Sequence, residues 1–277
     1  TWRRGSVTTW QAVLLGFVQG LTEFLPVSSS GHLVVVPEML NMAPPPVAFD
    51  VLLHFSSALA VIGYFAQDLY KMAKSFISPR DMSRAEVRGW RRLFVWLVIG
   101  TIPAGILGLA FRSFFERLFE STLAVGAFLM VTGAIMLIAD LVLDRTRAPR
   151  RTVRDMGLLD ALVIGLFQAM AIAPGLSRSG LTISGGVYLG LERRSAARFS
   201  FLLSVPVILG AGLLNAGDMA AGFSEAGAAY MAGAVASFVA SISAVHFLLR
   251  FLRSHRFTAF IIYTMAVGAF VVVLSLA

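Results

Sequence analysis

Residues 19–32, QGLTEFLPVSSSGH, break an apolar stretch that runs from residue 7 to residue 37. The break holds a glutamine, a carboxylate, a proline and three serines, so the stretch is typical of two short helices around a polar turn. Residues 157–191 have the same design around residues 174–180, PGLSRSG. Irregular backbone at membrane depth is tolerated only where protein buries it or a wet cavity adjoins it. We therefore predict two re-entrant helical hairpins.

The composition is that of a membrane protein. Of the 277 residues, 57% are hydrophobic and 14% are charged, and the mean hydropathy is +0.80. A soluble domain carries about 25% charged residues. In a membrane protein the net charge of +8 mostly reports loop topology rather than a nucleic-acid surface. The chain has no cysteine, which excludes disulfides, thiol nucleophiles and thiolate metal sites.

Six stretches are apolar enough to span a bilayer, which takes about 20 mostly apolar residues. They are residues 47–66, 93–111, 121–139, 199–217, 226–249 and 257–277. Only two of them contain a charged residue or a histidine, which are Asp50 and His54 in the first and His246 in the fifth. The sequence thus predicts an all-α integral membrane protein with six transmembrane helices and two re-entrant hairpins.

Basic residues are concentrated in alternate loops. Residues 67–92, 144–156 and 250–256 are rich in Lys and Arg, whereas residues 218–225 contain neither. Cytoplasmic loops carry such an excess, so we expect the three basic segments to be cytoplasmic and both termini to lie outside. The first hairpin then enters from the outside and the second from the cytoplasm.

The two halves of the chain resemble each other. A shift of 149 residues aligns residues 11–19, QAVLLGFVQ, with residues 160–168, DALVIGLFQ. The same shift superposes three residues of the first break on three of the second, namely Ser28 on Ser177, Ser30 on Ser179 and Gly31 on Gly180.

We predict one membrane domain, residues 1–277, built from repeats at about 7–143 and 157–277. Each repeat has one hairpin and three spans, and an odd number of spans inverts the second copy. Inverted repeats with broken helices have their site near the midplane, where the breaks meet. Chance similarity between two apolar segments is the alternative.

Glu23 is the first candidate for chemistry. Gln19 precedes it by four residues and so lies on the same helix face. A carboxylate in a membrane segment is costly and is by default a functional-site hypothesis. The alternative, which is compatible with function, is a structural glutamate paired with a buried arginine.

The serine run of the first break is the second candidate. Ser28, Ser29, Ser30 and Gly31 stand at the expected start of a helix, where hydroxyl groups and backbone amides can bind an anion. Simple helix capping would need only one serine. His32 is placed to exchange protons with a serine or a phosphate, and a structural histidine is the alternative.

The second break adds a guanidinium, Arg178, to Ser177, Ser179 and Gly180. Arginine keeps its charge and presents a fork of donors that matches phosphate oxygens. A structural arginine reaching the interface is the alternative. Two opposed helix starts with one arginine, one glutamate and several hydroxyls predict a phosphate or diphosphate pocket within the bilayer.

Asp50 and His54 lie four residues apart and either stand behind that pocket or form a polar patch between helices. The sequence has no His/Cys zinc cluster, no glycine-rich nucleotide loop and no acidic pair suited to glycoside hydrolysis.

Residues 19–32 and 174–180 closely resemble the two signature motifs of the bacterial undecaprenyl-diphosphate phosphatase family, the bacitracin-resistance type. The resemblance runs along nearly the whole chain, through the span count and the repeat. The family's first motif begins Glu/Gln-x-x-x-Glu, so Gln19 is an accepted variant that leaves Glu23 as its one carboxylate. Ser30 stands where some members have threonine.

The resemblance implies a phosphatase of the bacterial inner membrane that removes one phosphate from undecaprenyl diphosphate. The product is the lipid carrier that cell-wall synthesis reuses. We expect Arg178 to bind the diphosphate oxygens. The other expected substrate-binding residues are Gln19, Ser28, Ser30, Gly31, Ser177, Ser179 and Gly180.

For the reaction itself, we expect Ser29 as the nucleophile and His32 as its base and later as an acid. His32 as the nucleophile, or direct attack by water, stays open. Glu23, assisted by Gln19, is expected to hold a divalent cation, Mg²⁺ or Ca²⁺, because hard cations prefer oxygen ligands.

Two other classes of function are compatible with the pattern. Inverted repeats with broken helices are also transporter architecture, so the chain could flip a lipid phosphate or carry an anion. A non-catalytic lipid-binding subunit is the weaker alternative. Expected partners are a polyprenyl diphosphate and the membrane, with no nucleic acid. Small residues in 227–236 make a homodimer plausible, and we expect the site to open to the extracytoplasmic face.

Overall fold

The computed structural model describes residues 7–145 and 150–276, which form helices, loops and one isolated backbone bridge between Arg151 and Leu191. Parts of the predicted domain and of the basic segment 144–156 lie outside these ranges. The first half contains α1 (Thr9–Phe24), α2 (Ser29–Met39), α3 (Val47–Tyr64), α4 (Ala66–Ile77), α5 (Arg84–Ala110), α6 (Arg112–Phe119) and α7 (Thr122–Arg145). The second half contains α8 (Leu158–Met170), α9 (Arg178–Tyr188), α10 (Arg193–Leu214), α11 (Ala216–Phe251) and α12 (Thr258–Leu276).

The six predicted spans are confirmed. Six helices of the described chain are long and apolar enough to cross a membrane, and they are α3, α5, α7, α10, the Ala226–Phe251 part of α11, and α12. Several extend past the predicted limits because charged residues can continue a helix beyond the apolar layer. Thus α5 begins at Arg84, where Ser83 caps it by accepting a hydrogen bond from the Glu86 amide at 3.2 Å.

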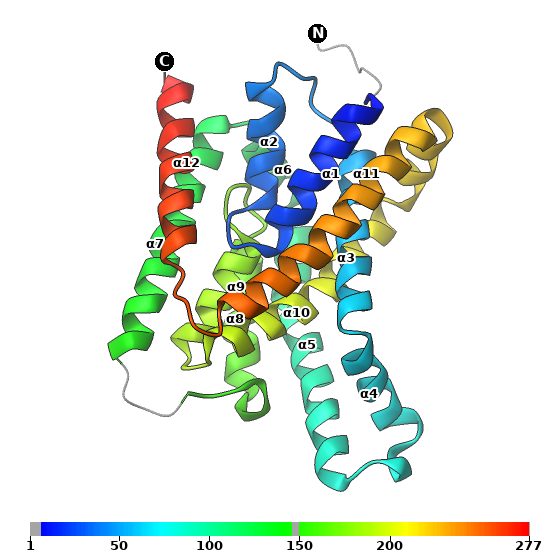
Figure 1. Cartoon of the computed structure of the whole chain (residues 1–277), viewed down its shortest axis with the longest axis vertical. Coiled ribbons are helices and arrows are strands. Elements are labelled where there is room, and N and C mark those ends of the chain that lie inside the picture. The colour runs from blue at the N-terminus through cyan, green and yellow to red at the C-terminus, as the bar shows by residue number, and fades with distance from the viewer. Residues whose placement is uncertain (1–6, 146–149, 277) are drawn as a thin grey trace.

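The basic segment predicted as a loop at 67–92 is largely helical. It contains α4, a 3-10 turn at Pro79–Asp81 and the first turns of α5. Figure 1 shows α4 and the start of α5 as an arm, called the basic arm below, that projects beyond the other helices at the end opposite to the two termini. The short segment after α5 is also a helix, α6, rather than a simple turn.

The two polar breaks form the turns between consecutive helices, the first between α1 and α2 and the second between α8 and α9. Figure 1 shows α1 running inward from the end that holds both termini and α2 returning to that end, which fits the predicted first hairpin. The second hairpin, α8 and α9, lies toward the opposite end. Each turn needs a residue in the left-handed region, Ser28 at φ 70° and Gly175 at φ 90°.

The halves pack on each other through matching glycine contacts. Gly16 of α1 lies against the backbone of Gly233 on α11, so closely that a Cβ atom would collide there. Gly165 of α8 lies in the same way against Gly100 on α5. Corresponding helices of the two halves thus make corresponding contacts, as two copies of one unit would. The exact limits of the repeats stay a prediction.

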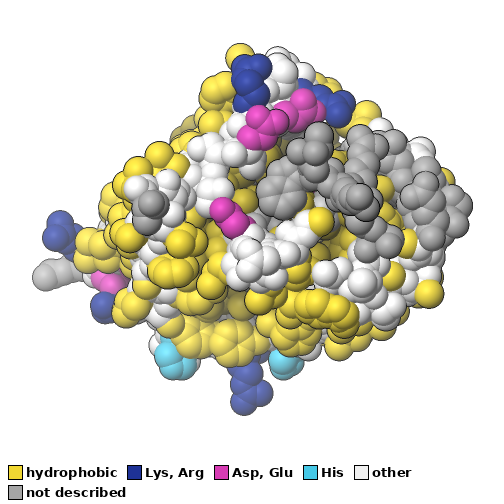
Figure 2. All heavy atoms as spheres, turned by 90° about the horizontal axis from the view of Figure 1, so that it is seen from above, with side chains coloured by type: hydrophobic (Ala, Val, Ile, Leu, Met, Phe, Trp, Pro, Cys, Tyr) yellow, Lys and Arg dark blue, Asp and Glu magenta, His cyan; other side chains and the backbone are white. Residues whose placement is uncertain are grey.

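Apolar side chains cover the outside of the helices. Large exposed residues follow the spans, for example Ile106 on α5, Val239 on α11 and Ile262 on α12. The end that holds the termini, shown in Figure 2, presents mostly hydrophobic and uncharged side chains. The exposed apolar surface along the sides of the spans is suited to lipid contact.

Candidate active site

The two breaks meet at a cavity of about 430 Å³. Residues of both hairpins and of α3 line it, among them Glu23, Ser28, Ser29, Ser30, Ser177, Arg178, Asp50 and His54. The remaining wall is largely apolar and comes from α5, the segment that follows α8, and α10, with residues such as Ala104, Ile172 and Ile208. A polar patch thus faces an apolar cavity, which suits a ligand with a charged head and a hydrocarbon tail.

An ion pair joins the two hairpins across this cavity. Arg178 Nη2 lies 2.6 Å from Glu23 Oε1, and both side chains are buried, with exposed fractions of 15% and 6%. A second nitrogen of Arg178 donates to the Ser200 carbonyl at 3.4 Å, and the guanidinium lies 5.9 Å from the centre of the Phe24 ring. The arginine is therefore held on α9 with its fork directed at the first hairpin.

The other oxygen of Glu23 collects three groups. Ser29 Oγ donates to Oε2 at 2.6 Å, and Gln19 Nε2 donates to it at 2.8 Å. His54 Nε2 lies 3.5 Å from the same oxygen. The contact from Gln19 is the one expected from its position one turn earlier on the same helix face. Glu23 is thus the point at which both hairpins and α3 converge.

The outer serines of the two breaks play equivalent structural roles. Ser28 caps α2 by accepting a hydrogen bond from the Gly31 amide at 3.3 Å. Ser177 caps α9 by accepting from the Gly180 amide at 3.1 Å. Ser28 therefore acts as a helix cap, whereas Ser29 is the serine of the first break that donates to Glu23.

The inner serines tie each break to the other. Ser30 Oγ accepts a hydrogen bond from the Gly175 amide at 3.4 Å. Ser179 Oγ donates to the Leu25 carbonyl at 2.9 Å. These reciprocal bonds fix the two turns relative to each other and hold Ser29 opposite Arg178.

Comparison with known proteins shows to which family the chain belongs. The family model described as bacitracin resistance protein BacA matches residues 12–270. The chain belongs to this family. It is 38% identical to a protein of Alkaliphilus metalliredigens over 98% of this chain and 100% of that one. It is 40% identical to one of Syntrophotalea carbinolica, over 93% and 95% of the two chains. Both relatives are named undecaprenyl-diphosphatase.

In this BacA-family chain His32 is not joined to Ser29 by any hydrogen bond of the described residues. Its Nδ1 lies 2.7 Å from the Ser28 carbonyl and its Nε2 lies 2.7 Å from the Tyr263 hydroxyl on α12. A carbonyl oxygen only accepts, so Nδ1 carries the proton and Nε2 is directed at Tyr263. The expected pairing of His32 with Ser29 is therefore not what the structure shows.

His54, rather than His32, is the histidine that contacts Glu23. Its Nδ1 donates to the Asp50 carbonyl at 2.8 Å, and its Nε2 lies 3.5 Å from Glu23 Oε2, a contact that is an ion pair when both ring nitrogens carry a proton. The signal in the sequence was the pair of polar residues four apart in an otherwise apolar span. That signal alone did not distinguish a residue in contact with Glu23 from a polar patch between helices.

Some buried side-chain oxygen atoms have no hydrogen-bond partner. Among the described residues they include Gln19 Oε1, on the side chain that also contacts Glu23, and Asp50 Oδ1, one turn before His54. Oxygen atoms of this kind are the ligands that a hard cation prefers. No group of three His, Cys, Asp or Glu side chains able to hold a metal occurs in the part of the chain described. In the substrate-free chain both oxygens of Glu23 accept from neighbouring donors, so a cation here would take most of its ligands from substrate and water oxygens rather than from a cage of protein ligands.

Proposed function

We propose that the chain is a membrane-embedded phosphatase that converts undecaprenyl diphosphate to undecaprenyl phosphate and phosphate. The observation that carries the proposal is the triad of Ser29, Glu23 and Arg178 at the meeting point of the two breaks. It places a hydroxyl group, a proton acceptor and a fixed positive charge at one wall of an apolar cavity. The names of the relatives support hydrolysis rather than transport.

Ser29 is the proposed nucleophile. Its Oγ attacks the terminal phosphorus of the diphosphate while its proton passes to Glu23 Oε2, which already accepts its hydrogen bond. The bond between that phosphorus and the bridging oxygen breaks, and undecaprenyl phosphate leaves with the bridging oxygen. A phosphate ester on Ser29 remains.

Water then completes the reaction. It attacks the phosphorus of the serine ester, gives one proton to a neighbouring base and releases phosphate as Ser29 takes a proton back. Glu23, with His54 behind it at 3.5 Å, is the group placed to move both protons. Direct attack of water on the diphosphate would use the same glutamate and leave no serine ester.

Arg178 is the proposed phosphate clamp. In the substrate-free chain its guanidinium is neutralised by Glu23. A phosphate group entering the cavity offers more oxygen acceptors to the same fork of donors. Phosphoryl transfer depends mainly on positioning and on neutralising the charge of the transferred group, and Arg178 supplies both.

A divalent cation, Mg²⁺ or Ca²⁺, remains part of the proposal. Glu23 and Gln19 would hold it together with the diphosphate, and the unpartnered oxygens of Gln19 and Asp50 support such a site. When bound, the cation would neutralise charge on the phosphate oxygens.

We also propose the bacterial inner membrane as the location, with the cavity open to the extracytoplasmic side. The basic arm and the basic turn after α11 support this orientation, because they lie away from the end with the termini. A homodimer through the small residues of α11 stays a prediction.

Phosphate release in detergent tests the proposal. Purified protein in dodecyl maltoside is expected to release phosphate from undecaprenyl diphosphate, to lose activity with a chelator and to regain it with Mg²⁺ or Ca²⁺. Hydrolysis needs no second compartment, whereas transport does. Absence of phosphate release, combined with movement of a lipid phosphate across proteoliposomes, would support the transporter instead. Full activity in the chelator would remove the cation from the proposal.

A further inference from the structure

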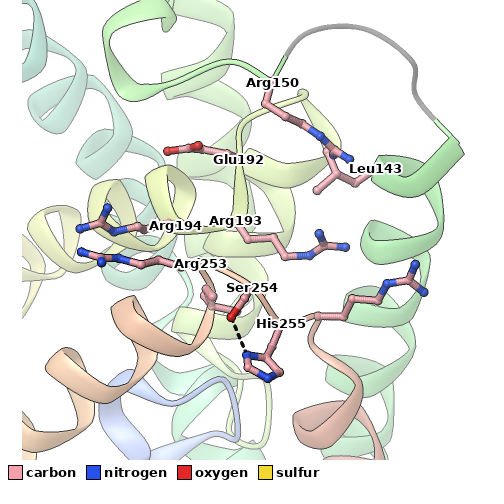
Figure 3. A pocket seen from close by; sticks show the side chains of 10 residues that line it. Leu143, Arg150, Glu192, Arg193, Arg194, Arg253, Ser254 and His255 are labelled. Carbon is pink, nitrogen blue, oxygen red and sulfur yellow. Dashed lines mark hydrogen bonds between the residues drawn. The ribbon is translucent and has the colours of Figure 1, made fainter.

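A second cavity, of about 410 Å³, lies at the end of α10 that is remote from the substrate cavity. It is formed by the start of α10, the turn between α11 and α12, the end of α7 and the segment before α8 (Figure 3). Its lining residues are Leu143, Arg150, Glu192, Arg193, Arg194, Leu252, Arg253, Ser254, His255 and Arg256. Five arginines from three separate segments are thus among its lining residues.

Two of these arginines form a fixed framework. Arg193 Nη2 lies 2.6 Å from Asp140 and 3.2 Å from Asp144, both on α7. Arg256 Nη2 lies 3.1 Å from Asp144, and the backbone amide of Phe257 donates to Asp140 at 2.8 Å. These contacts hold α7, α10 and the turn before α12 together, so the wall of the cavity exists without a ligand.

The other three arginines have no carboxylate partner among the described residues: Arg150, Arg194 and Arg253. Figure 3 shows Arg194 and Arg253 extending in the same direction from α10 and from the turn after α11, while Arg193 extends toward α7. Glu192 is the one carboxylate in the lining, and it accepts a hydrogen bond from Ser195 at 2.7 Å. The cavity therefore keeps a positive charge that its own residues do not neutralise.

We propose that this cavity binds a phosphate-bearing anion and that its occupant is the headgroup of an anionic phospholipid. The cavity lies at the ends of four spanning helices, α7, α10, α11 and α12, where lipid headgroups lie. Basic pockets between transmembrane helices on the cytoplasmic side bind anionic headgroups, and arginine forks match phosphate oxygens. Free inorganic phosphate has the same chemistry, and the experiment below separates the two sources.

The site is distinct from the substrate cavity but shares α10 with it. Ser200, whose carbonyl accepts from Arg178, lies about two helical turns beyond Arg193. Binding is therefore measured directly and not through phosphate release, so the result does not depend on the proposed phosphatase activity.

Thermal unfolding in dodecyl maltoside is the measurement. Dioctanoyl phosphatidylglycerol is expected to raise the unfolding temperature in a saturable way, whereas dioctanoyl phosphatidylcholine is not. In the double variant Arg194→Gln/Arg253→Gln the apparent Kd for phosphatidylglycerol should rise about tenfold or more. Each single variant should show part of the effect, which keeps the test valid if the double variant is unstable. Saturation by inorganic phosphate at similar concentration would instead identify free phosphate as the occupant of the site.

The matched control is Arg84→Gln/Arg88→Gln on the exposed start of α5. It removes the same charge from the same end of the molecule but lies outside the cavity. Wild-type affinity in this control, with loss in the cavity variant, supports the proposal. Equal loss in both variants would mean that only the general basic charge of this end attracts anions. Unchanged affinity in the cavity variant would exclude the site.

Discussion

Arg178 and Glu23 are 155 residues apart in the sequence and form a 2.6 Å ion pair between the turns of the two hairpins. Each is the charge that allows the other to be buried, because an isolated buried charge costs several kcal/mol. The ion pair therefore has two roles. It is a structural contact between the halves, and it holds a guanidinium at the substrate cavity that an incoming phosphate can engage.

Replacement of Arg178 should stop the reaction. Arg178→Ala is expected to lower phosphate release by about 100-fold or more, the usual cost of removing one donor to a charged transition state. Arg178→Lys should recover only part of the activity because an ammonium lacks the planar fork. The readout is kcat and KM for phosphate release.

Arg198→Lys is the matched control for that experiment. Arg198 lies on α10, outside the lining of the substrate cavity, pairs with Asp68 at 2.6 Å and is 43% exposed. Its replacement should leave phosphate release near the wild-type rate. Full activity in Arg178→Lys would mean that residue 178 acts as a point charge or as an anchor between the halves.

The three serines of the first break should differ in effect. Ser29→Ala is expected to lower kcat by about 1,000-fold because the group facing Glu23 is lost. Ser28→Ala should instead cost about 1 kcal/mol of stability through the lost helix cap, with a smaller change in kcat. Phosphate release and thermal unfolding, measured on both variants, separate the two effects. A covalent phosphate trapped on His32 rather than on Ser29 would move the nucleophile.

Replacements of His54 and of His32 should have different effects in the phosphate-release assay. His54→Gln is expected to lower kcat about tenfold or more and to change the shape of the pH–rate profile, because His54 shares an oxygen of Glu23 with Ser29. His32→Gln should chiefly lower stability through loss of its contact with Tyr263. If instead His32→Gln alters the pH–rate profile and His54→Gln does not, His32 is the proton-transfer group.

Local patterns in the sequence were sufficient for the spans, the breaks and the pairing of Gln19 with Glu23. Each of these follows from residues close in the chain, through apolar length, helix-breaking residues or a spacing of four. The partner of Arg178 was anticipated only as a general alternative, a buried arginine paired with a glutamate. The residue in contact was fixed by the packing of the two hairpins.

Other features could not be obtained from local patterns. His32 meets Tyr263, a residue 231 positions away, and no spacing within one helix encodes such a contact. The basic arm was expected as a loop because its many charged residues obscure the apolar pattern of α4 in the sequence. In the structure α4 packs on α5, and Met72 and Leu93 belong to the same hydrophobic cluster. A count of charges reports topology but not whether a segment is helical.

The matching glycine contacts predict matching sensitivity in the two halves. Gly16→Val and Gly165→Val should each lower stability by about 1–3 kcal/mol, because a side chain would collide with the backbone of the facing helix. Gly63→Ala and Gly105→Ala are the controls, since a Cβ atom at either position meets open space. Thermal unfolding of the four variants is the measurement. Tolerance of Gly165→Val together with loss of stability in Gly16→Val would argue against equivalent packing.

The accessibility of Ser30 tests which face of the membrane the substrate cavity opens to. The first hairpin enters from the end that holds both termini, away from the basic arm, so Ser30 should be reached from outside the cell. The chain contains no cysteine, so a single Ser30→Cys substitution provides an unambiguous probe. A membrane-impermeant maleimide added to intact cells should label it, and prior addition of a polyprenyl diphosphate should slow the labelling.

Arg88→Cys, on the basic arm, is the matched control and should react only after the cytoplasmic face is opened. Labelling of both positions only in opened cells would place the cavity on the cytoplasmic side. Slow labelling of Ser30→Cys from either side, with Arg88→Cys labelled from the cytoplasm alone, would indicate that the hairpins expose the cavity alternately.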